Sequence, residues 1–298
     1  MGLLHPGQMG ATVGRALVAG GARVLWCSRG RSRETAERAA AAGLVDADDL
    51  ALLAARCDRV VAVCPPAAAS DLARAVLAAG FRGIYVDANA VAPETAAAIA
   101  RAVEAEGCAF VDGGIVGPPA HRAGSTRLYL SGARAPEVAE GFAGSHLDAR
   151  VVAGGAGAAS ALKMAYAAWT KGSSALLLAS RALAHHAGVE ESLLEEWRLS
   201  QPHLEQLTEG TARGVSPKAW RFAGEMEEIA AAFAAAGLPS GFHLAAAEVY
   251  GRLAGFRTGE PADAAAAAEA LLAGRGSAPG HSEAAPLTSS MKKPTVSR

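Results

Sequence analysis

The first thirty residues follow an order that few folds accommodate: a strand, a glycine turn, a helix and a second strand. Leu3-Leu4 begins a short apolar strand, Ala11 to Ala19 is predicted as a helix, and Arg23 to Cys27 is predicted as the second strand. The turn between the first strand and the helix is His5-Pro6-Gly7-Gln8-Met9-Gly10. This order is the beginning of a dinucleotide-binding βαβ unit, and it predicts a parallel sheet.

The turn keeps two of the three glycines of the usual G-x-G-x-x-G pattern. His5 stands at the first glycine position, while Gly7 and Gly10 remain. Gly7 would let the backbone approach a pyrophosphate at the helix N-terminus, and Gly10 would let the helix pack closely on the strand. Two glycines alone also fit an ordinary tight turn, but the flanking elements favour a cofactor. The predicted cofactor contacts in this turn are His5, Pro6, Gly7, Gln8, Met9 and Gly10.

The end of the second strand indicates which cofactor binds. An NAD-specific site places Asp or Glu here to accept from the ribose 2′-hydroxyl, whereas this chain has Ser28-Arg29-Gly30-Arg31-Ser32-Arg33. Arginine can pair with a 2′-phosphate through charge-assisted hydrogen bonds. We therefore expect NADP, with Ser28, Arg29, Arg31 and Ser32 as contacts; the alternative is a solvated basic loop.

Strands and helices continue to alternate up to residue 153. The predicted strands are Arg59 to Cys64, Gly83 to Asp87, Ala109 to Asp112, 127–131 and 150–152, and Gly113 to Pro119 is predicted as a rigid loop. The alternation predicts an α/β fold with a Rossmann-like, doubly wound and mostly parallel sheet over residues 1–153. Ligands bind at the carboxyl edge of such sheets, so Cys64, Pro65, Pro66 and Asn89 are expected to contact the nicotinamide.

After Gly154 the sequence changes to helical periodicity. Gly154-Gly155 opens a helical pattern that runs to about His186, which at ~1.5 Å per residue is roughly 45 Å long. Amphipathic segments follow at 190–209, 217–236, 241–253 and 263–272. We expect an all-α domain over residues 154–273, joined to the sheet domain through the long helix. Residues 274–298 are poor in apolar side chains and are expected to form a disordered tail.

Composition narrows the classes of partner. The net charge is −1, so neither nucleic acid nor an anionic membrane is expected as a partner. The four cysteines are scattered without a CxxC pair, which is typical of a reduced, cytoplasmic protein. No H-E-x-x-H motif or Cys/His cluster occurs, so no metal is predicted. The most apolar part of the long helix, 175–179, is too short to span a bilayer.

Four landmarks resemble the β-hydroxyacid dehydrogenase and 6-phosphogluconate dehydrogenase-like superfamily, which includes imine reductases. Pro6 to Gly10 resembles the family's G-L-G-x-M-G, and Asp112 to Pro118 stands where the family has D-A-P-V-S-G-G. Gly124 to Gly132 resembles the following G-T-L stretch, and Gly154 to Lys163 resembles G-x-x-G-x-G-x-x-x-K. The resemblance implies that Lys163 is the catalytic acid or base and that helical domains interlock in a homodimer.

The chain also departs from the family pattern. Val116 stands where the family has its substrate-binding Ser, and Ala167 stands where an Asn orients the catalytic Lys. Tyr166, one turn from Lys163, is a candidate to replace the missing polar group, or it is a packed aromatic. The resemblance implies a substrate site between the nicotinamide and the long helix, against Gly114, Val116 and Gly117.

The helical domain adds further substrate-binding candidates. Trp220 and Glu225 lie on one predicted helix, and Glu225 and Glu228 could face the cleft together or form a solvated acidic face. His243 is either an acid/base group or a structural histidine. The adjacent His185 and His186 diverge around their helix and do not form a metal pair.

These features together predict an NADP-dependent oxidoreductase. It would transfer hydride between NADP(H) and a small hydroxy or keto acid, with Lys163 as general acid/base; this role needs a pKa brought toward neutral. One alternative is an NADPH-dependent imine reductase: a cationic Lys disfavours an iminium, whereas an acid such as Glu225 would favour it. Another alternative is a non-catalytic NADP-binding protein.

Overall fold

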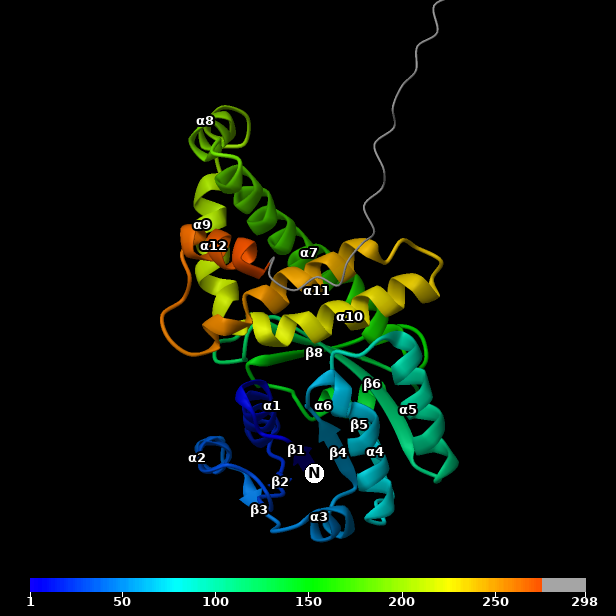
Figure 1. The fold of residues 1–298 in the computed structure, drawn as a ribbon. Coiled ribbons are helices and arrows are strands. Elements are labelled where there is room, and N and C mark those ends of the chain that lie inside the picture. The colour runs from blue at the N-terminus through cyan, green and yellow to red at the C-terminus, as the bar shows by residue number, and fades with distance from the viewer. Residues whose placement is uncertain (275–298) are drawn as a thin grey trace, which may run out of the picture.

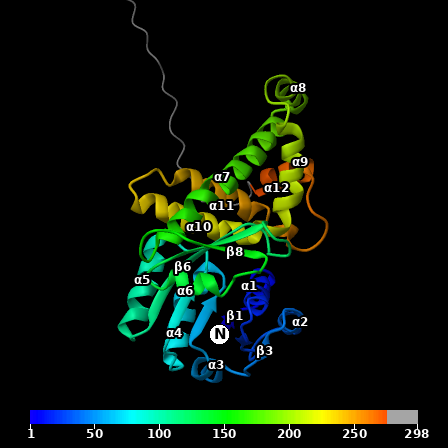
Figure 2. The same cartoon turned by 180° about the vertical axis from the view of Figure 1, so that it is seen from behind.

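The structure is a computed structural model that describes residues 1–274. It consists of a sheet domain and, above the sheet's carboxyl edge, a helical domain (Figure 1). The long helix α7 (Ala158–His186) rises from the sheet domain and carries the rest of the helical domain, as the view from behind also shows (Figure 2). The tail predicted for residues 274–298 lies outside the described residues, apart from Gly274.

The sheet domain alternates strands and helices as expected. In chain order its elements are β1 (Gly2–Leu4), α1 (Gln8–Ala19), β2 (Leu25–Trp26), α2 (Arg33–Ala41), β3 (Val45–Asp46), α3 (Leu50–Arg56), β4 (Arg59–Ala62), the 3₁₀ turn η1 (Pro66–Ala68), α4 (Ala69–Ala78), β5 (Ile84–Asp87), α5 (Pro93–Ala105), β6 (Ala109–Val116), β7 (Thr126–Ser131), α6 (Ala135–Glu140) and β8 (Leu147–Val151). The helix α6 and the two-residue strand β3 were not predicted as separate elements.

Within residues 1–274 the strands form one sheet in the order β3-β2-β1-β4-β5-β6-β7-β8. Neighbouring strands are parallel except β6 and β7, which pair antiparallel with Gly114 opposite Tyr129. The strand order reverses beside β1, between β1 and β4, which is the switch point where doubly wound sheets bind ligands. The predicted doubly wound, mostly parallel sheet is confirmed.

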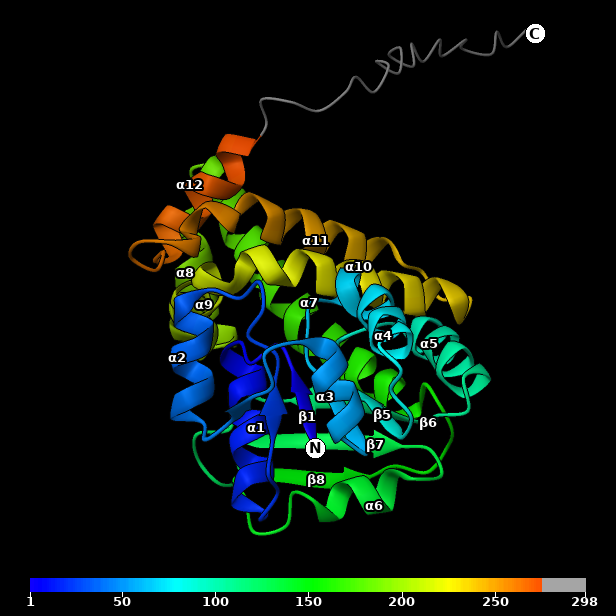
Figure 3. The same ribbon diagram turned by 90° about the horizontal axis from the view of Figure 1, so that it is seen from below.

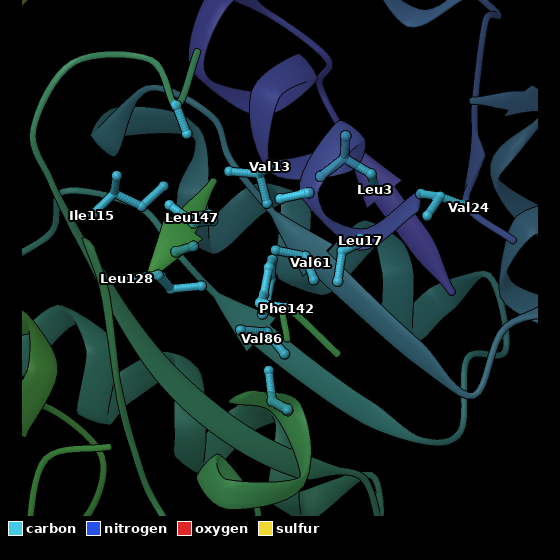
Figure 4. Close-up of a cluster of buried hydrophobic side chains, with 14 of the residues drawn as sticks. Leu3, Val13, Leu17, Val24, Val61, Val86, Ile115, Leu128, Phe142 and Leu147 are labelled. Carbon is cyan, nitrogen blue, oxygen red and sulfur yellow. The ribbon is translucent and has the colours of Figure 1, made fainter. Parts of the chain in front are cut away.

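The two faces of the sheet are separated by the alternation of side chains along each strand. Leu3, Val61 and Val86 point into one core with α1 and α6, where Val13, Leu17 and Phe142 meet them (Figure 4). Their neighbours in sequence point to the other face, which α3, α4 and α5 cover. Figure 3 shows these two sets of helices on either side of the strands. Buried strands with both faces covered explain the continuous apolar runs in the sequence.

The rigid loop predicted over Gly113 to Pro119 begins only at Gly117, because β6 continues through Val116. A Cβ on Gly113 would lie 2.9 Å from the carbonyl oxygen of Asp87, and Gly114 is equally crowded from the other side. The glycines therefore mark a strand that other backbones approach closely, and not a turn.

Other boundaries also differ from the prediction. Helix α1 begins at Gln8, three residues earlier than expected, because Gly7 is its N-cap and the end of the glycine turn is already helical. Strand β2 is limited to Leu25–Trp26. The segment 190–209 is two helices, because the chain breaks at Gln201 before Pro202.

The helical domain packs around α7 from Met164 onward. Its further elements are α8 (Glu190–Ser200), α9 (Leu204–Val215), η2 (Ser216–Lys218), α10 (Ala219–Ala235), α11 (Gly241–Arg252), η3 (Ala254–Arg257) and α12 (Ala264–Ala273). Alanines dominate its core, where Met226, Ile229 and Tyr250 fill the space between α7, α10 and α11. Small side chains let these helices approach closely, so α10 and α11 can lie together over the sheet edge (Figure 1).

Candidate active site

The N-terminus of α7 is anchored by a buried aspartate at the edge of the sheet. Asp112 on β6 accepts hydrogen bonds from the backbone N–H groups of Gly157 (3.0 Å) and Ser160 (2.9 Å), and from the Ser160 hydroxyl (2.6 Å). The Ser131 hydroxyl on β7 adds a further contact to Asp112 and accepts from Ala159 N–H at 3.0 Å. These bonds satisfy N–H groups that the first helical turn leaves open, and they fix the position of α7 against the sheet.

Lys163 follows one turn later and lies directly against β6. A Cβ on Gly114 would stand 2.9 Å from Lys163 Cβ and 2.7 Å from the carbonyl oxygen of Ala159. Only a glycine therefore allows this approach. The structure brings together Gly114 and Lys163, which the sequence separates by 49 positions.

Lys163 is half-buried, and the charges of Lys171 and Glu225 act on its ammonium group. Burial, and then the positive charge of Lys171, lower the pKa of Lys163 to about 8, although Glu225 acts in the opposite direction. Lys163 therefore has both protonation states accessible near neutral pH, which a group that accepts and donates protons requires.

Glu225 on α10 pairs with Lys171 on α7, and both side chains are largely withdrawn from solvent. Burial alone would raise the pKa of Glu225, but the charges of Lys171 and Lys163 outweigh it, so the pKa lies below its usual value. The solvated acidic face considered for this helix is therefore wrong. The sequence analysis assigned no role to Lys171, because this lysine belongs to no recognised motif.

Glu228, one turn after Glu225, joins the helical domain to the sheet domain. Its Oε2 accepts a hydrogen bond of 2.6 Å from the backbone N–H of Ala92, which is 136 residues away in the sequence. Ala92 is the N-cap of α5 and ends the segment that follows β5. The bond thus places α10 over the carboxyl edge of β5.

The polar groups at this edge are deeply buried. Asn89 Oδ1 accepts from the backbone N–H of Cys64 at 2.6 Å and so links the ends of β4 and β5, while Asn89 Nδ2 and Asp87 Oδ2 have no partner within residues 1–274. Burial raises the pKa of Asp87 to about 7 and that of the Cys64 thiol to about 12. Unsatisfied buried polar atoms beside the sheet edge are suited to an amide-bearing ligand.

The glycine turn has the geometry that a dinucleotide needs. A Cβ on Gly10 would lie 2.3 Å from the carbonyl oxygen of His5, so Gly10 is required for helix α1 to pack on β1. Gly7 has open space around its Cα at the N-terminus of α1, where a phosphate could stand. His5, at the first glycine position of the G-x-G-x-x-G pattern, adopts φ of 63°, a left-handed conformation that glycine adopts without strain.

A cavity of about 470 Å³ opens beside the ends of β1 and β2. Arg29 and Arg31 line it together with Cys27, Asp49 and Leu50. Arg29 forms an ion pair with Asp49 at 3.2 Å, whereas Arg31 lies 3.4 Å from His5 Nε2. Burial and then Arg31 lower the pKa of His5 to about 4, so its ring is neutral at pH 7. This cavity and the glycine turn together fit a dinucleotide.

Two serines of the basic loop have local partners. The Ser28 backbone N–H donates to Asp46 Oδ1 at 3.3 Å, and the Ser32 hydroxyl caps α2 by accepting from Thr35 N–H. Their roles as cofactor contacts stay predictions, as do those of Pro65 and Pro66, which stand where η1 packs beneath α10.

The remaining predicted substrate residues are placed at different depths. Val116 is buried in β6, and Gly117 (φ 118°) ends that strand against Ser125. Tyr166 is half-exposed, and Trp220 lies at the solvent side of α10 with Arg257 4.2 Å from its ring centroid. Their contact with substrate stays a prediction.

His243 lies in the core of the helical domain. Its ring packs 4.2 Å from that of Phe233 and beside Gly172, nine residues along α7 from Lys163. Burial lowers its pKa, and its Nδ1 has no partner within residues 1–274. This position is typical of a structural histidine.

Neither a metal-binding cluster nor a membrane-spanning helix occurs within residues 1–274. No group of three His, Cys, Asp or Glu side chains there stands close enough together to hold a metal ion. None of the helices in this range combines the length and the apolar character that a bilayer crossing requires.

Two protein families match separate parts of this chain. Residues 1–140 match the NAD-binding domain of 6-phosphogluconate dehydrogenase, and residues 184–253 match a domain of unknown function (DUF1932). A curated relative from Methanothermus fervidus, an uncharacterized 28.5 kDa protein in a 7S RNA 5′ region, is 31% identical over 171 residues, which are 57% of this chain and 64% of that protein. The chain thus spans less than two thirds of this relative's length.

Two solved structures share the whole architecture. One is a conserved protein of unknown function described as structurally similar to 3-hydroxyacid dehydrogenases; it is 28% identical, with a TM-score of 0.64 over 86% of this chain and 97% of that one. The other is 3-hydroxyisobutyrate dehydrogenase of Mycobacterium tuberculosis, 20% identical, with a TM-score of 0.64 over 91% and 98%. Residues 1–140 are therefore similar to the NAD-binding domain of 6-phosphogluconate dehydrogenase, and the chain shares the fold of these two solved structures.

Proposed function

We propose that this protein is an NADP-dependent dehydrogenase or reductase that interconverts a small hydroxy acid and the matching keto acid or related carbonyl, with Lys163 as the general acid/base. The observation that carries the proposal is the setting of Lys163. It is held against Gly114 at the carboxyl edge of the sheet, and its pKa is lowered to about 8. A lysine placed so is suited to proton transfer in both directions.

The chain's residues divide the work between binding and proton transfer. Gly7, Gly10 and the N-terminus of α1 would hold the pyrophosphate, and Asn89 would face the nicotinamide end. When bound, the cofactor supplies the hydride acceptor or donor. In the oxidative direction, neutral Lys163 Nζ accepts the hydroxyl proton of the substrate. In the reductive direction, the protonated Nζ donates this proton to the carbonyl oxygen and stabilises the charge that develops there.

The basic loop supports NADP in preference to NAD. Asp46 and Asp49 stand near the end of β2, but Asp46 accepts from Ser28 N–H and Asp49 pairs with Arg29. Arg31 has no carboxylate partner within residues 1–274, and its one side-chain hydrogen bond there is with neutral His5. A guanidinium without a counter-charge beside the cavity is suited to a 2′-phosphate.

The charges around Lys163 favour a carbonyl over an imine substrate. Two lysines, 163 and 171, face one carboxylate, Glu225, so that the group has one net positive charge when Lys163 is protonated. Glu225, which would favour an iminium, is already neutralised by Lys171. A net positive charge attracts a carboxylate substrate and stabilises a developing oxyanion.

The test combines a variant and a substrate panel. Lys163→Met should lower turnover by roughly 10²–10⁴-fold, while NADPH binding, followed by cofactor fluorescence, stays unchanged. Wild type should oxidise or reduce members of a hydroxy and keto acid panel and leave cyclic imines untouched. Reduction of the imines alone would identify an imine reductase. NADPH binding without turnover on any compound would identify a non-catalytic binding protein.

A homodimer is the assembly that we propose for this chain. Tyr166, Trp169, Leu176 and Leu183 form an exposed stripe on α7, and Trp169 is 76% exposed. Their spacing of three and then seven residues keeps them on one side of the helix. An apolar stripe along the long helix is typical of an interface, and a second copy, as the family resemblance implies, would bury it.

A further inference from the structure

Lys171 is held by three contacts that nothing in the proposed reaction requires by itself. Its Nζ forms an ion pair with Glu225, and it lies 4.6 Å from the centroid of the Phe222 ring. Its backbone carbonyl accepts a hydrogen bond of 2.6 Å from the Tyr250 hydroxyl. Only 14% of the Lys171 side chain and 18% of the Glu225 side chain is exposed. Because lysine is rarely buried without a specific partner, this placement points to a role at the site.

Glu225 uses one oxygen for this pair. Oε2 contacts Lys171, whereas none of the hydrogen bonds within residues 1–274 involves Oε1. Arg221 stands one turn earlier on α10, and its charge also acts on Glu225. Lys171 therefore fixes the orientation of a carboxylate that still acts on Lys163.

The charged and titratable groups around Lys163 come from few elements. Helix α7 itself contributes Lys171. Helix α10 contributes Glu225, on which the charge of Arg221 also acts. From α11, Tyr250 stays a neutral phenol because burial raises its pKa. From β6, Gly114 adds no charge, and Asp112 is occupied by the N-terminus of α7. Lys171 and Glu225 are thus the two groups whose opposite charges act on Lys163 most directly.

We propose that Lys171 is a positioning residue: it holds the Glu225 carboxylate in place and offsets its charge, so that the pair decides how readily Lys163 gives up its proton. The proposal rests on Lys163 as the acid/base group of the proposed function. Lys171 does not touch the reacting atoms in this scheme. Its effect passes through Glu225 and through its own charge.

The two halves of the pair act on Lys163 with opposite signs. Lys171→Met removes a cation and leaves the Glu225 carboxylate facing Lys163 alone, which stabilises protonated Lys163. Glu225→Gln removes the anion and leaves Lys171 facing Lys163, which destabilises protonated Lys163. In the double variant both charges are absent, so that only burial remains. A merely structural role would shift both single variants in the same direction.

The experiment measures the protonation of Lys163 directly in the full-length protein without substrate or cofactor. The rate of trace acetylation of Lys163 is followed by peptide mass spectrometry from pH 6 to pH 11. The midpoint of the acetylation rate should lie at about 8 in wild type. It should be about one pH unit or more higher in Lys171→Met and lower than wild type in Glu225→Gln. The double variant should lie between the two single variants.

Three further variants serve as controls. Glu227→Gln changes an exposed neighbour on α10, and Lys218→Met removes an exposed lysine just before that helix; neither should move the midpoint. Lys171→Arg keeps the positive charge and should restore the wild-type midpoint. Because removal of one member of a buried pair can unfold a protein, circular dichroism accompanies each titration.

Shifts of the same sign in both single variants, or no shift in either while both are folded, would overturn the proposal. The proposed function is tested separately by the loss of turnover in Lys163→Met. Opposite shifts together with full turnover in Lys163→Met would sustain the tuning of Lys163 and refute its catalytic role. Loss of turnover in Lys163→Met without opposite shifts would sustain the catalytic role of Lys163 and refute its tuning by Lys171 and Glu225.

Discussion

Gly114 on β6 and Lys163 on α7 are in such close contact that a methyl group at position 114 would lie 2.9 Å from Lys163 Cβ. The glycine thus sets the distance between the sheet edge and the helix that carries the lysine. Asp112, two residues earlier on the same strand, holds the beginning of that helix. Strand β6 therefore fixes both how closely α7 approaches the sheet and where α7 begins.

Gly114→Ala should displace α7 and misplace Lys163. Overpacking of this kind costs about 1–3 kcal/mol of folding free energy, and a displacement of about 1 Å can reduce turnover by roughly 10²-fold. Thermal unfolding and steady-state kinetics measure the two effects. Gly210→Ala, in the middle of α9 with open space around it, is the matched control and should not reduce either quantity. An unchanged turnover in Gly114→Ala would show that this contact does not position Lys163.

The pH dependence of the wild-type reaction should differ in sign between the two directions. Oxidation needs neutral Lys163, and since burial and Lys171 lower the pKa of Lys163 to about 8, its rate should rise with pH through this value and then level off. Reduction needs protonated Lys163, so its rate should fall across the same range. Initial rates at saturating substrate between pH 6 and pH 10 check this expectation. Parallel profiles in both directions would contradict it.

Arg31→Ala should weaken NADPH binding by about tenfold or more, since a charge-assisted contact contributes roughly 1.5–3 kcal/mol. NADH binding should change little, because NADH has no 2′-phosphate. Fluorescence titration of each cofactor gives the two dissociation constants. Arg33→Ala removes a nearby arginine that pairs with Glu37 at the surface, and it should leave both constants unchanged. Equal losses for NADPH and NADH in Arg31→Ala would reject the assignment.

Leu176→Glu should disrupt a dimer formed through α7. A carboxylate in the middle of the exposed apolar stripe would lose its hydration on association, without a partner to compensate. Light scattering coupled to size-exclusion chromatography would show a dimer for the wild type and a monomer for the variant. Leu52→Glu changes an exposed leucine on α3 and should keep the wild-type mass. A monomeric wild type would contradict the proposed homodimer.

Local sequence signals were sufficient for most of the architecture. The alternation of apolar strands with helices predicted the doubly wound sheet, and the helical periodicity after Gly154-Gly155 predicted α7, because both depend on residues near one another in the chain. The turn before α1 was likewise readable, since its glycines permit approaches that other residues forbid. The same logic failed at Gly113-Gly114, because a glycine has the same sequence signature in a turn and in a crowded strand.

The charges of the site depended on contacts between distant segments. Lys163 was identified through its motif, but the charged groups around it were not. Lys171 contacts Glu225, which is 54 residues away in the sequence, and Glu228 contacts Ala92, which is 136 residues away. A sequence shows that a helix carries acids, but not which of them faces inward. Periodicity and turn chemistry therefore predicted the elements, and the resemblance of Gly154 to Lys163 to a family motif predicted the lysine. The tertiary structure alone decided which charges surround that lysine, since long-range packing brings them out of water and within reach of one another.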